Sequence, residues 1–544
     1  MKNLFYARYF KFPSDTIVEK YLFILSTAAL FFFSAYTLFI SVSSHLEYIS
    51  FPYQHEYMEG AALNSTKVYL NNENPFDISH QPQDTYVYGF LYPLIVSPLA
   101  KVYGNTLAVH RCVTYVFILL TCLLIFLALN SIKINPVFAF TAAVILHQSF
   151  IYNGLIAIAR PEGLGIFLFT LGILIPWRFK FSSWSCLVSV FLGVLAYLAK
   201  PYYVMVIPFV FIYIFIFVSK RKALWYAVIS VLFILLMILS VSLIYETLFN
   251  NSFFHPKNMA VYDFSHMKDQ LIRYLKVNVY LFLIIILSIT IIVKSFSYEI
   301  SKTATRKFFK TVSSKFLFNK NINIFRNEPL IKTNYDLLFG FVFLFSLILF
   351  IVKLGGNIGN GRGAYLYHLA SAFLVLTTFQ LVRTSNVKLF KSVVAILLIY
   401  TLTYQFKPIR FDYAISVTCF EKIEELIRKS NNPLNSPEVV SIMIDQNKTV
   451  LNSGHSEYFK TGVSDLSLLT GASRNVEKRE EEFEKGLNNE IINKKFDVIL
   501  LTKGNHYRLI DTAALTQYYQ CADTICAYMP SKEWKIELWY PKNK

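Results

Sequence analysis

Long uninterrupted runs of apolar residues constrain this chain more than any other feature. Stretches of about twenty nearly uncharged residues recur along its first four fifths, and a helix of that length crosses a hydrocarbon core of roughly 30 Å. The composition agrees, because 55% of the 544 residues are hydrophobic, only 16% are charged, and the mean hydropathy is +0.45. A soluble domain carries more charge. The sequence therefore predicts a polytopic α-helical membrane protein.

We expect about eleven transmembrane helices in the first four fifths of the chain. They are predicted at residues 20–43, 108–130, 136–156, 163–178, 183–200, 202–219, 223–245, 275–293, 335–353, 364–382 and 389–407. The stretch before the first of them carries Lys2, Arg8 and Lys11, and no small-residue cleavage site follows it. This pattern favours a retained signal anchor over a removed signal peptide.

The formal net charge of +18 follows the predicted topology. Basic residues cluster at 220–222 and at 302–326, and counting spans places both clusters on the same side as the N-terminus. The positive-inside rule makes this side the cytoplasm, so the loop at residues 44–105 and the C-terminal tail lie outside the cytoplasmic (inner) membrane. Because the positive charge mostly records topology and contact with anionic membrane lipid, we expect no nucleic-acid partner.

Two domains are predicted, a membrane domain at residues 1–407 and an extracytoplasmic α/β domain at residues 408–544. In the tail, alternating and continuous apolar runs indicate strands, and charged amphipathic runs indicate helices. The strands are expected at 439–445, 495–501 and 534–540, and the helices at 419–429 and 476–487. Cys521 and Cys526 are close enough in sequence to allow a disulfide in an oxidising compartment, and no second ligand pair completes a zinc site.

The predicted first external loop contains HEYMEGAAL, in which Glu56 and Glu59 are three residues apart. If the segment is helical, this spacing places both carboxylates on one face, where they can act on a common target. The alternative is a pair of solvated surface acids.

Further charged residues lie where predicted spans meet the outer surface: Arg111, Arg160, Glu162, Lys200 and Arg362. Ionisable groups at an apolar boundary are costly, which makes them functional candidates. For each cation the alternative is an anchor that reaches lipid phosphate. Together the cations would ring one site that faces the two acids.

This combination of charges suits one kind of reaction. Cations stabilise a departing lipid phosphate, and a carboxylate accepts the proton of an attacking hydroxyl. Sugar transfer from a polyprenyl-phosphate carrier uses both groups.

The segment from Tyr57 to Tyr115 resembles the first external loop of GT-C glycosyltransferases of the protein-mannosyltransferase and aminoarabinose-transferase type. The residues that carry the resemblance are Glu59-Gly60, Asn74-Pro75-Phe76, Tyr92-Pro93, Gly104 and Arg111. ARPEGLGIFLFTLGIL, LAKPYY and GNGRGAYLYHLASAFL are similar to later motifs of the family and occur in the family's order. The tail looks like the external α/β domain of bacterial relatives.

The resemblance implies a GT-C fold and an inverting hexosyl- or pentosyltransferase. In this resemblance Glu59 takes the position of the catalytic acid, and Glu56 tunes it. The family's two acids are adjacent or one residue apart, whereas here they are three apart. Which of the two is the base therefore stays open. The resemblance makes the other site residues substrate-binding, with Arg160, Lys200 and Arg362 holding the leaving phosphate and the tyrosines stacking on sugar. These residues are Arg111, Arg160, Glu162, Lys200, Arg362, His368, Tyr57, Tyr86, Tyr88 and Tyr92.

The implied donor is a polyprenyl-phosphate sugar, and the implied acceptor is a glycan, a lipid-linked saccharide or a protein. No cofactor is required; a divalent metal, Mg or Mn, held by His55, Glu56 and Glu59 is the open alternative. Three other functions compete with transfer: a transporter or flippase for lipid-linked saccharides, a glycan polymerase or ligase, and a non-catalytic relative whose tail binds a partner. A transporter predicts internal repeats and ionisable groups near the bilayer midplane, and the sequence shows neither.

Overall fold

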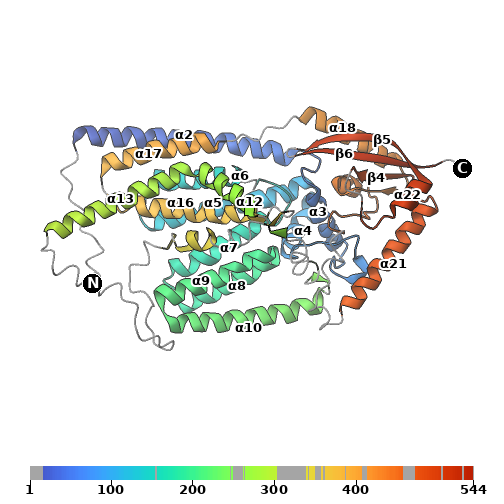
Figure 1. Ribbon diagram of the computed structural model, residues 1–544, viewed down its shortest axis with the longest axis horizontal. Helices are drawn as coiled ribbons and strands as arrows, with labels where there is room; N and C mark the ends of the chain where they lie inside the picture. The colour runs from blue at the N-terminus through green and yellow to red at the C-terminus, as the bar shows by residue number, and fades with distance from the viewer. Residues whose placement is uncertain are drawn as a thin grey trace.

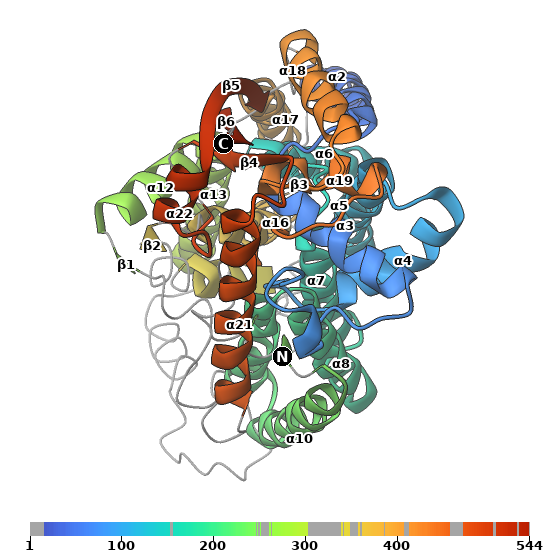
Figure 2. The ribbon, with the colours of Figure 1, turned by 90° about the vertical axis from the view of Figure 1, so that its right-hand side faces the viewer.

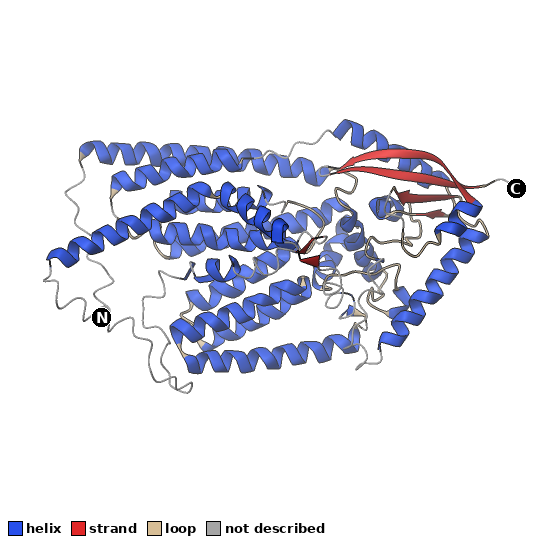
Figure 3. Cartoon of the chain, viewed as in Figure 1, coloured by secondary structure: helices blue, strands red, loops and turns tan. Residues whose placement is uncertain are grey.

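The computed structural model describes residues 16–152, 156–245, 247–248, 251, 261–262, 264–302, 339–340, 342–348, 357–358, 362–385, 387–406, 413–456, 472–503, 507–529 and 532–542. These residues are mostly helical, and their longest strands lie in the tail (Figure 3). Figure 1 shows a bundle of long helices with the sheet at one end.

Helices lie at the predicted spans. They are α2 (Ile17–Ser50), α5 (Leu107–Ser131), α6 (Pro136–Tyr152), α7 (Glu162–Arg178), α8 (Ser183–Ala199), η2 (Pro201–Met205), α9 (Val206–Tyr213), η3 (Ile214–Val218), α10 (Lys220–Ile244), α12 (Phe264–Val277), α13 (Val279–Lys302), α16 (Arg362–Val382) and α17 (Lys388–Gln405). Of the predicted span at 335–353, residues 339–340 and 342–348 are described and are helical. Short strands β1 (Val261–Tyr262) and β2 (Asn357–Ile358) pair antiparallel.

Four of the described helical segments are long and apolar enough to cross a membrane: α2, α5, Pro201–Val218 and α10. A fifth is added if Met267–Val277 and Val279–Ile292, which meet at 69°, form one span. The outer faces of these helices are apolar, as Phe32 and Phe39 of α2 and Leu239 of α10 show by their exposure. The chain is therefore a helical membrane protein, and the count of about eleven spans stays a prediction.

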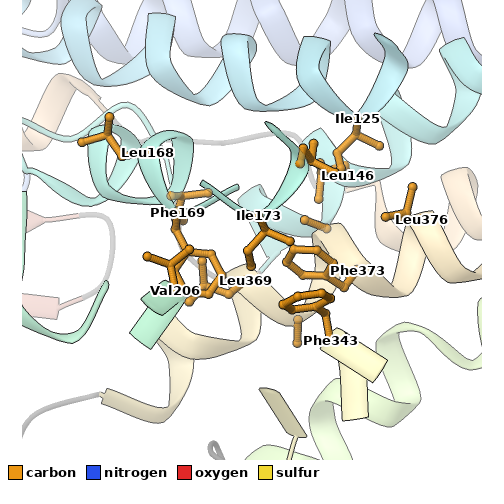
Figure 4. Close-up of a cluster of buried hydrophobic side chains, with 14 of the residues drawn as sticks. Ile125, Leu146, Leu168, Phe169, Ile173, Val206, Phe343, Leu369, Phe373 and Leu376 are labelled. Atoms are coloured by element: carbon orange, nitrogen blue, oxygen red, sulfur yellow. The ribbon is translucent and has the colours of Figure 1, made fainter. Parts of the chain in front are cut away.

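The interior of the bundle is packed with interlocking aliphatic and aromatic side chains. α17 lies along α2, and α7 packs against both α5 and α8. Figure 4 shows part of this core, in which Phe169 and Ile173 of α7 lie near Phe373 of α16. Because lipid is as apolar as these side chains, close packing rather than water exclusion holds such helices together.

The first loop, residues 51–106, contains three short helices: α3 (Tyr57–Leu70), η1 (Ile78–His80) and α4 (Leu91–Tyr103). At Gly89 the backbone of this loop packs directly against the bundle. A Cβ at that position would lie only 1.8 Å from the carbonyl oxygen of Leu198, near the end of α8. The loop can therefore approach α8 this closely only with glycine there.

The tail forms a four-stranded mixed sheet with helices on both faces. Its elements are α18 (Tyr413–Lys429), β3 (Pro433–Leu434), η5 (Pro437–Val439), α19 (Val440–Asp445), α21 (Ala472–Ile492), β4 (Val498–Thr502), α22 (Thr512–Tyr518), β5 (Tyr519–Met529) and β6 (Lys532–Pro541). The strand order is β3-β4-β6-β5, with β3 parallel to β4 and the other neighbours antiparallel.

Alternate residues of β4 enter two different cores. Val498 and Leu500 pack with α18 and α19, whereas Ile499 and Leu501 pack with α21 and α22. The first of these cores also contains Phe51, Tyr53, Leu63, Leu107 and Ala159. The tail is thus joined to the first loop and the bundle by a shared apolar core. Figure 2, which faces the tail, shows α19 close to α3.

The predicted strands at 495–501 and 534–540 are confirmed as β4 and β6, and both predicted tail helices are confirmed as α18 and α21. The predicted strand at 439–445 is wrong, because Val440–Asp445 forms helix α19. Its residues Val440 to Ile444 are all buried, and a short, fully buried run has no periodicity that separates helix from strand. Strand β5 was not predicted from the sequence. A bulge between Cys521 and Asp523 interrupts the alternation of its side chains between the two faces of the sheet.

Cys521 is a free, exposed thiol, so the disulfide that the sequence allows is not formed. Cys521 and Cys526 lie on the same extended strand, β5, and five residues of strand separate their Cα atoms by about 16 Å, far beyond the 7 Å that a disulfide tolerates. The side chain of Cys526 lies outside the described residues.

The Gly89→Ala variant should fail to assemble the loop on the bundle. The new Cβ meets a backbone oxygen that cannot rotate away, and overpacking costs about 1–3 kcal/mol, with the upper end expected for a contact this short. Yield and Tm of the detergent-purified protein measure the effect. The matched control is Gly486→Ala in α21, where nothing lies within 4 Å of the new Cβ; its Tm should be unchanged or higher. A Gly89→Ala protein as stable as wild type would contradict the packing.

Candidate functional site

Arg111 of α5 is fully buried and uses all five of its N–H groups. Nε and Nη2 donate to Oε1 and Oε2 of Glu59, at 2.9 and 2.8 Å. Nη1 donates to the carbonyl oxygens of Tyr48 and Phe51, and Nη2 donates to that of Tyr53. The guanidinium therefore holds together the end of α2, the start of the first loop and α3.

Glu59 is equally enclosed. Besides Arg111, its carboxylate accepts hydrogen bonds from the backbone N–H of His55 at 2.6 Å and of Ala159 at 2.8 Å. Burial alone would raise the pKa of Glu59, but the charge and hydrogen bonds of Arg111 outweigh it and lower the pKa to about 2. A fully buried carboxylate with four donors and a low pKa is suited to holding structure rather than to accepting a proton from a substrate.

Glu56 lies in a different environment. α3 begins at Tyr57, so Glu56 is the N-cap residue, with extended backbone angles (φ −151°, ψ 146°). Its side chain is 24% exposed and pairs with Arg160 Nη1 at 2.5 Å. The expectation that both acids lie on one helical face is therefore wrong, because the helix starts between them. They bind different arginines.

Arg160 and Lys200 both bind Glu162, which opens α7. Arg160 Nη2 lies 2.7 Å from Glu162 Oε1, and Lys200 Nζ, at the end of α8, contacts the same oxygen. With Glu56 these residues form a chain of alternating charge, which we call the ion cluster: Glu56, Arg160, Glu162 and Lys200. Two acids balance two bases, as burial requires. Glu162 Oε2 is buried and accepts no hydrogen bond from the described residues.

Aromatic side chains enclose the ion cluster. Lys200 Nζ lies 4.2 Å from the centre of the Tyr88 ring, and Arg160 Nη2 donates to the Tyr88 hydroxyl at 3.1 Å. His455 of the tail packs edge-on against the Tyr88 ring at 5.4 Å and contacts Tyr86 at 5.7 Å. The tail domain thus contributes to the walls of the site. No local pattern could have identified His455, which comes from a distant part of the chain.

The remaining predicted residues lie apart from the ion cluster. The Tyr92 ring is fully buried and its hydroxyl bonds to the His110 carbonyl and to Thr114, so it offers no face to a sugar. His368 is buried within α16, with its ring 6.2 Å from that of Phe150. Arg362 is the first residue of α16, and its side chain lies outside the described residues. The single cation ring expected from the sequence is therefore two units, Arg111 with Glu59 and the ion cluster.

His55, Glu56 and Glu59 do not fit a metal centre. Each oxygen of Glu59 already accepts two hydrogen bonds, which occupy both lone pairs. The His55 ring is stacked between Tyr48 and Phe51, at centroid distances of 3.5 and 4.8 Å. Within the described part of the chain, no group of three His, Cys, Asp or Glu side chains is placed to hold a metal.

Comparison with known proteins returns no match to any family model, any curated protein or any solved structure. The GT-C resemblance and the function that it implies therefore stay predictions.

The Glu59→Gln variant should lose stability at neutral pH. It leaves the Arg111 charge buried without its counter-ion, and a pKa lowered from 4.5 to about 2 corresponds to about 3 kcal/mol. Because the folded-state pKa is depressed, this contribution is complete above pH 4.5 and disappears as the pH falls towards 2. Thermal unfolding in detergent from pH 7 to pH 3 should show wild type and variant converging on acidification. A constant difference across that range would contradict the ionised pair.

Proposed function

We propose that the protein transfers a sugar from a polyprenyl-phosphate donor to an acceptor hydroxyl at the ion cluster, with inversion at the sugar carbon. The observation that carries the proposal is Glu56, a partly exposed carboxylate held by Arg160 inside an otherwise buried cluster of two acids and two bases. A carboxylate that a substrate can reach, beside cations that can bind phosphate, supplies the two groups that such a transfer needs.

In the proposed mechanism the donor phosphate binds Arg160 and Lys200. Both cations are now paired with carboxylates, so phosphate binding competes with Glu56 for Arg160. Release from Arg160 frees the Glu56 carboxylate to accept the proton of the acceptor hydroxyl. The hydroxyl oxygen bonds to the sugar carbon, the bond from that carbon to the phosphate oxygen breaks, and the phosphate leaves with the electron pair, its charge balanced by Arg160 and Lys200.

Glu59 and Glu162 have positioning roles in this mechanism. Glu59 keeps Arg111 and the main chain at Ala159 in place, next to Arg160. Glu162 positions both cations, and its second oxygen, Oε2, is an acceptor that a sugar hydroxyl can satisfy. The Tyr88 ring lies against Lys200, where a sugar face can also stack. The geometry favours Glu56 over Glu59 as the base.

The proposed setting is the cytoplasmic membrane, with about eleven spans, the N-terminus inside, and the site and tail outside. A transporter would place ionisable groups near the bilayer centre. In the described helices of the bundle, the buried Arg, Lys and Glu side chains instead lie near helix ends, as for Glu162 at the start of α7, Lys200 at the end of α8 and Lys220 at the start of α10. This distribution supports chemistry at one membrane surface over transport.

Glu56→Gln should abolish sugar transfer and leave folding intact, since its amide cannot take the hydroxyl proton. The control is Glu47→Gln, which removes an exposed carboxylate near the end of α2 and should be fully active. Mass spectrometry of envelope glycans and lipid-linked saccharides, in a deletion strain complemented with each variant, measures the effect. We expect Glu56→Gln to lose one sugar and accumulate its polyprenyl-phosphate donor. Its Tm should fall much less than that of Glu59→Gln, because Glu56 is partly exposed and Arg160 keeps its pair with Glu162.

Two outcomes would contradict this proposal. A fully active Glu56→Gln protein would show that this carboxylate is not the base. Unchanged glycan composition with a lipid-linked saccharide trapped on the inner leaflet would point to transport. Transfer that survives EDTA treatment would agree with a mechanism in which the ion cluster needs no metal.

A further inference from the structure

Helix α12 lies across the bundle at the end nearest the tail. It meets α13 at a bend of 69°, and Figure 2 shows it crosswise at the edge of the molecule. Its depth follows from two contacts. The Arg273 guanidinium lies 5.6 Å from the ring centre of Tyr152, the last residue of α6, and the Tyr274 ring stacks on Tyr367 near the start of α16. Since Ala159, shortly after α6, packs in the core shared with the tail, this level is the tail end of the bundle.

The side chains of α12 divide between a buried face and an exposed apolar one. Met267 and Tyr274 are seven residues apart, share a face and are buried against the bundle. Phe264, Ile272 and Leu275 are exposed, Phe264 to 65%, and their spacings of eight and three residues place them together on another side. No residue that the structure describes covers this apolar side.

Charged side chains set α12 apart from a membrane span. Lys268, Asp269, Arg273 and Lys276 are all exposed, which is too much charge for a helix that crosses the hydrocarbon core. None of the four forms an ion pair with another described residue. Lys268 and Lys276 lie four residues before and after Ile272, so both flank the apolar side.

The next helix continues the apolar surface. Val279, Leu283 and Ile286 of α13 are exposed and share a face, as expected for a helix in contact with lipid. Leu275 and Val279 lie on either side of the bend, so the apolar side of α12 begins where the lipid-facing surface of α13 ends. A cationic amphipathic helix at this depth has the pattern of one that lies in the membrane interface.

We propose that α12 rests on the membrane surface at the tail end of the bundle and binds anionic phospholipid there. Its apolar side enters between the acyl chains, and the ammonium groups of Lys268 and Lys276 contact lipid phosphates while their alkyl stems run along the apolar side. The two lysines are about 12 Å apart along the helix axis, so they bind separate headgroups. Three exposed cations against one exposed acid favour lipids of net negative charge. The proposal does not depend on sugar transfer.

Tryptophan quenching by brominated lipids tests the proposal on the full-length protein. The reporter is Ile272→Trp, between the two lysines, and the signal of the five native tryptophans is subtracted using the parent protein. Reconstitution into vesicles of phosphatidylcholine mixed with dibrominated phosphatidylglycerol or dibrominated phosphatidylcholine gives the relative binding constant of the two lipids. Phosphatidylglycerol should bind about fivefold more strongly at this reporter, the factor expected for a lysine at a charged surface.

Two controls isolate the contribution of α12. Lys268→Gln with Lys276→Gln should bring the relative binding constant close to one. Lys478→Gln with Lys485→Gln, which removes the same charge from the exposed face of α21 in the tail, should leave it near five. A reporter on the lipid-facing side of α10, Leu239→Trp, should be quenched equally by both lipids.

Three outcomes would overturn the proposal. Absence of quenching at Ile272→Trp would mean that water, another protein or a second copy of the chain covers this side of α12. Equal quenching by both lipids would show apolar contact without binding of anionic lipid. A preference that survives loss of both lysines would assign the binding to other groups. Leu275→Trp is a second reporter on the same side, so the test does not depend on the folding of one variant.

Discussion

The buried pair between Arg111 and Glu59 is the interaction on which the rest of the site depends. The guanidinium binds two main-chain carbonyls at and just beyond the end of α2, those of Tyr48 and Phe51, which have no partner within the helix, and so acts as the C-cap of a membrane helix. The same side chain fixes Glu59 on α3, which in turn binds the N–H of Ala159. One ion pair thereby joins three segments that are distant in sequence. Such a pair is costly to bury and more costly to break.

This constraint determines where the residues of the ion cluster lie. Ala159 precedes Arg160, and Glu56 precedes α3, so anchoring Ala159 and Glu59 brings Arg160 to Glu56. The two acids of HEYMEGAAL therefore lie in different environments. Glu59 is buried and all its acceptor positions are hydrogen-bonded, whereas Glu56 is partly exposed to solvent. The tail adds to the arrangement by placing His455 against Tyr88 and by packing Val440 against Gly60.

Much of the fold could be predicted from the sequence, because long apolar runs permit few structures in a membrane. The position of α5, for instance, follows from its apolar length. Of the site residues, Arg160, Glu162 and Lys200 were predicted as one group and are in contact.

Other features depend on tertiary contacts that no local pattern encodes. The start of α3 at Tyr57 separates Glu56 from Glu59, although their spacing suits a shared helical face. Arg111 was predicted as a substrate-binding cation, but three of its N–H groups bind main-chain carbonyls about sixty residues earlier in the chain. Every residue has such a carbonyl, so the sequence does not indicate which ones a side chain will bind. Val440–Asp445 is a helix that packs against α3, and its short apolar run could indicate neither the helix nor this contact.

The most direct test of this account is an electron cryomicroscopy structure of the full chain with a non-hydrolysable polyprenyl-phosphate sugar analogue. We predict phosphate density in contact with Arg160 and Lys200, a broken ion pair between Arg160 and Glu56, the Glu56 carboxylate turned towards the sugar, and an intact pair between Arg111 and Glu59. Phosphate bound by an opened Arg111, or bound elsewhere with the ion cluster unchanged, would contradict the division of roles between the two acids.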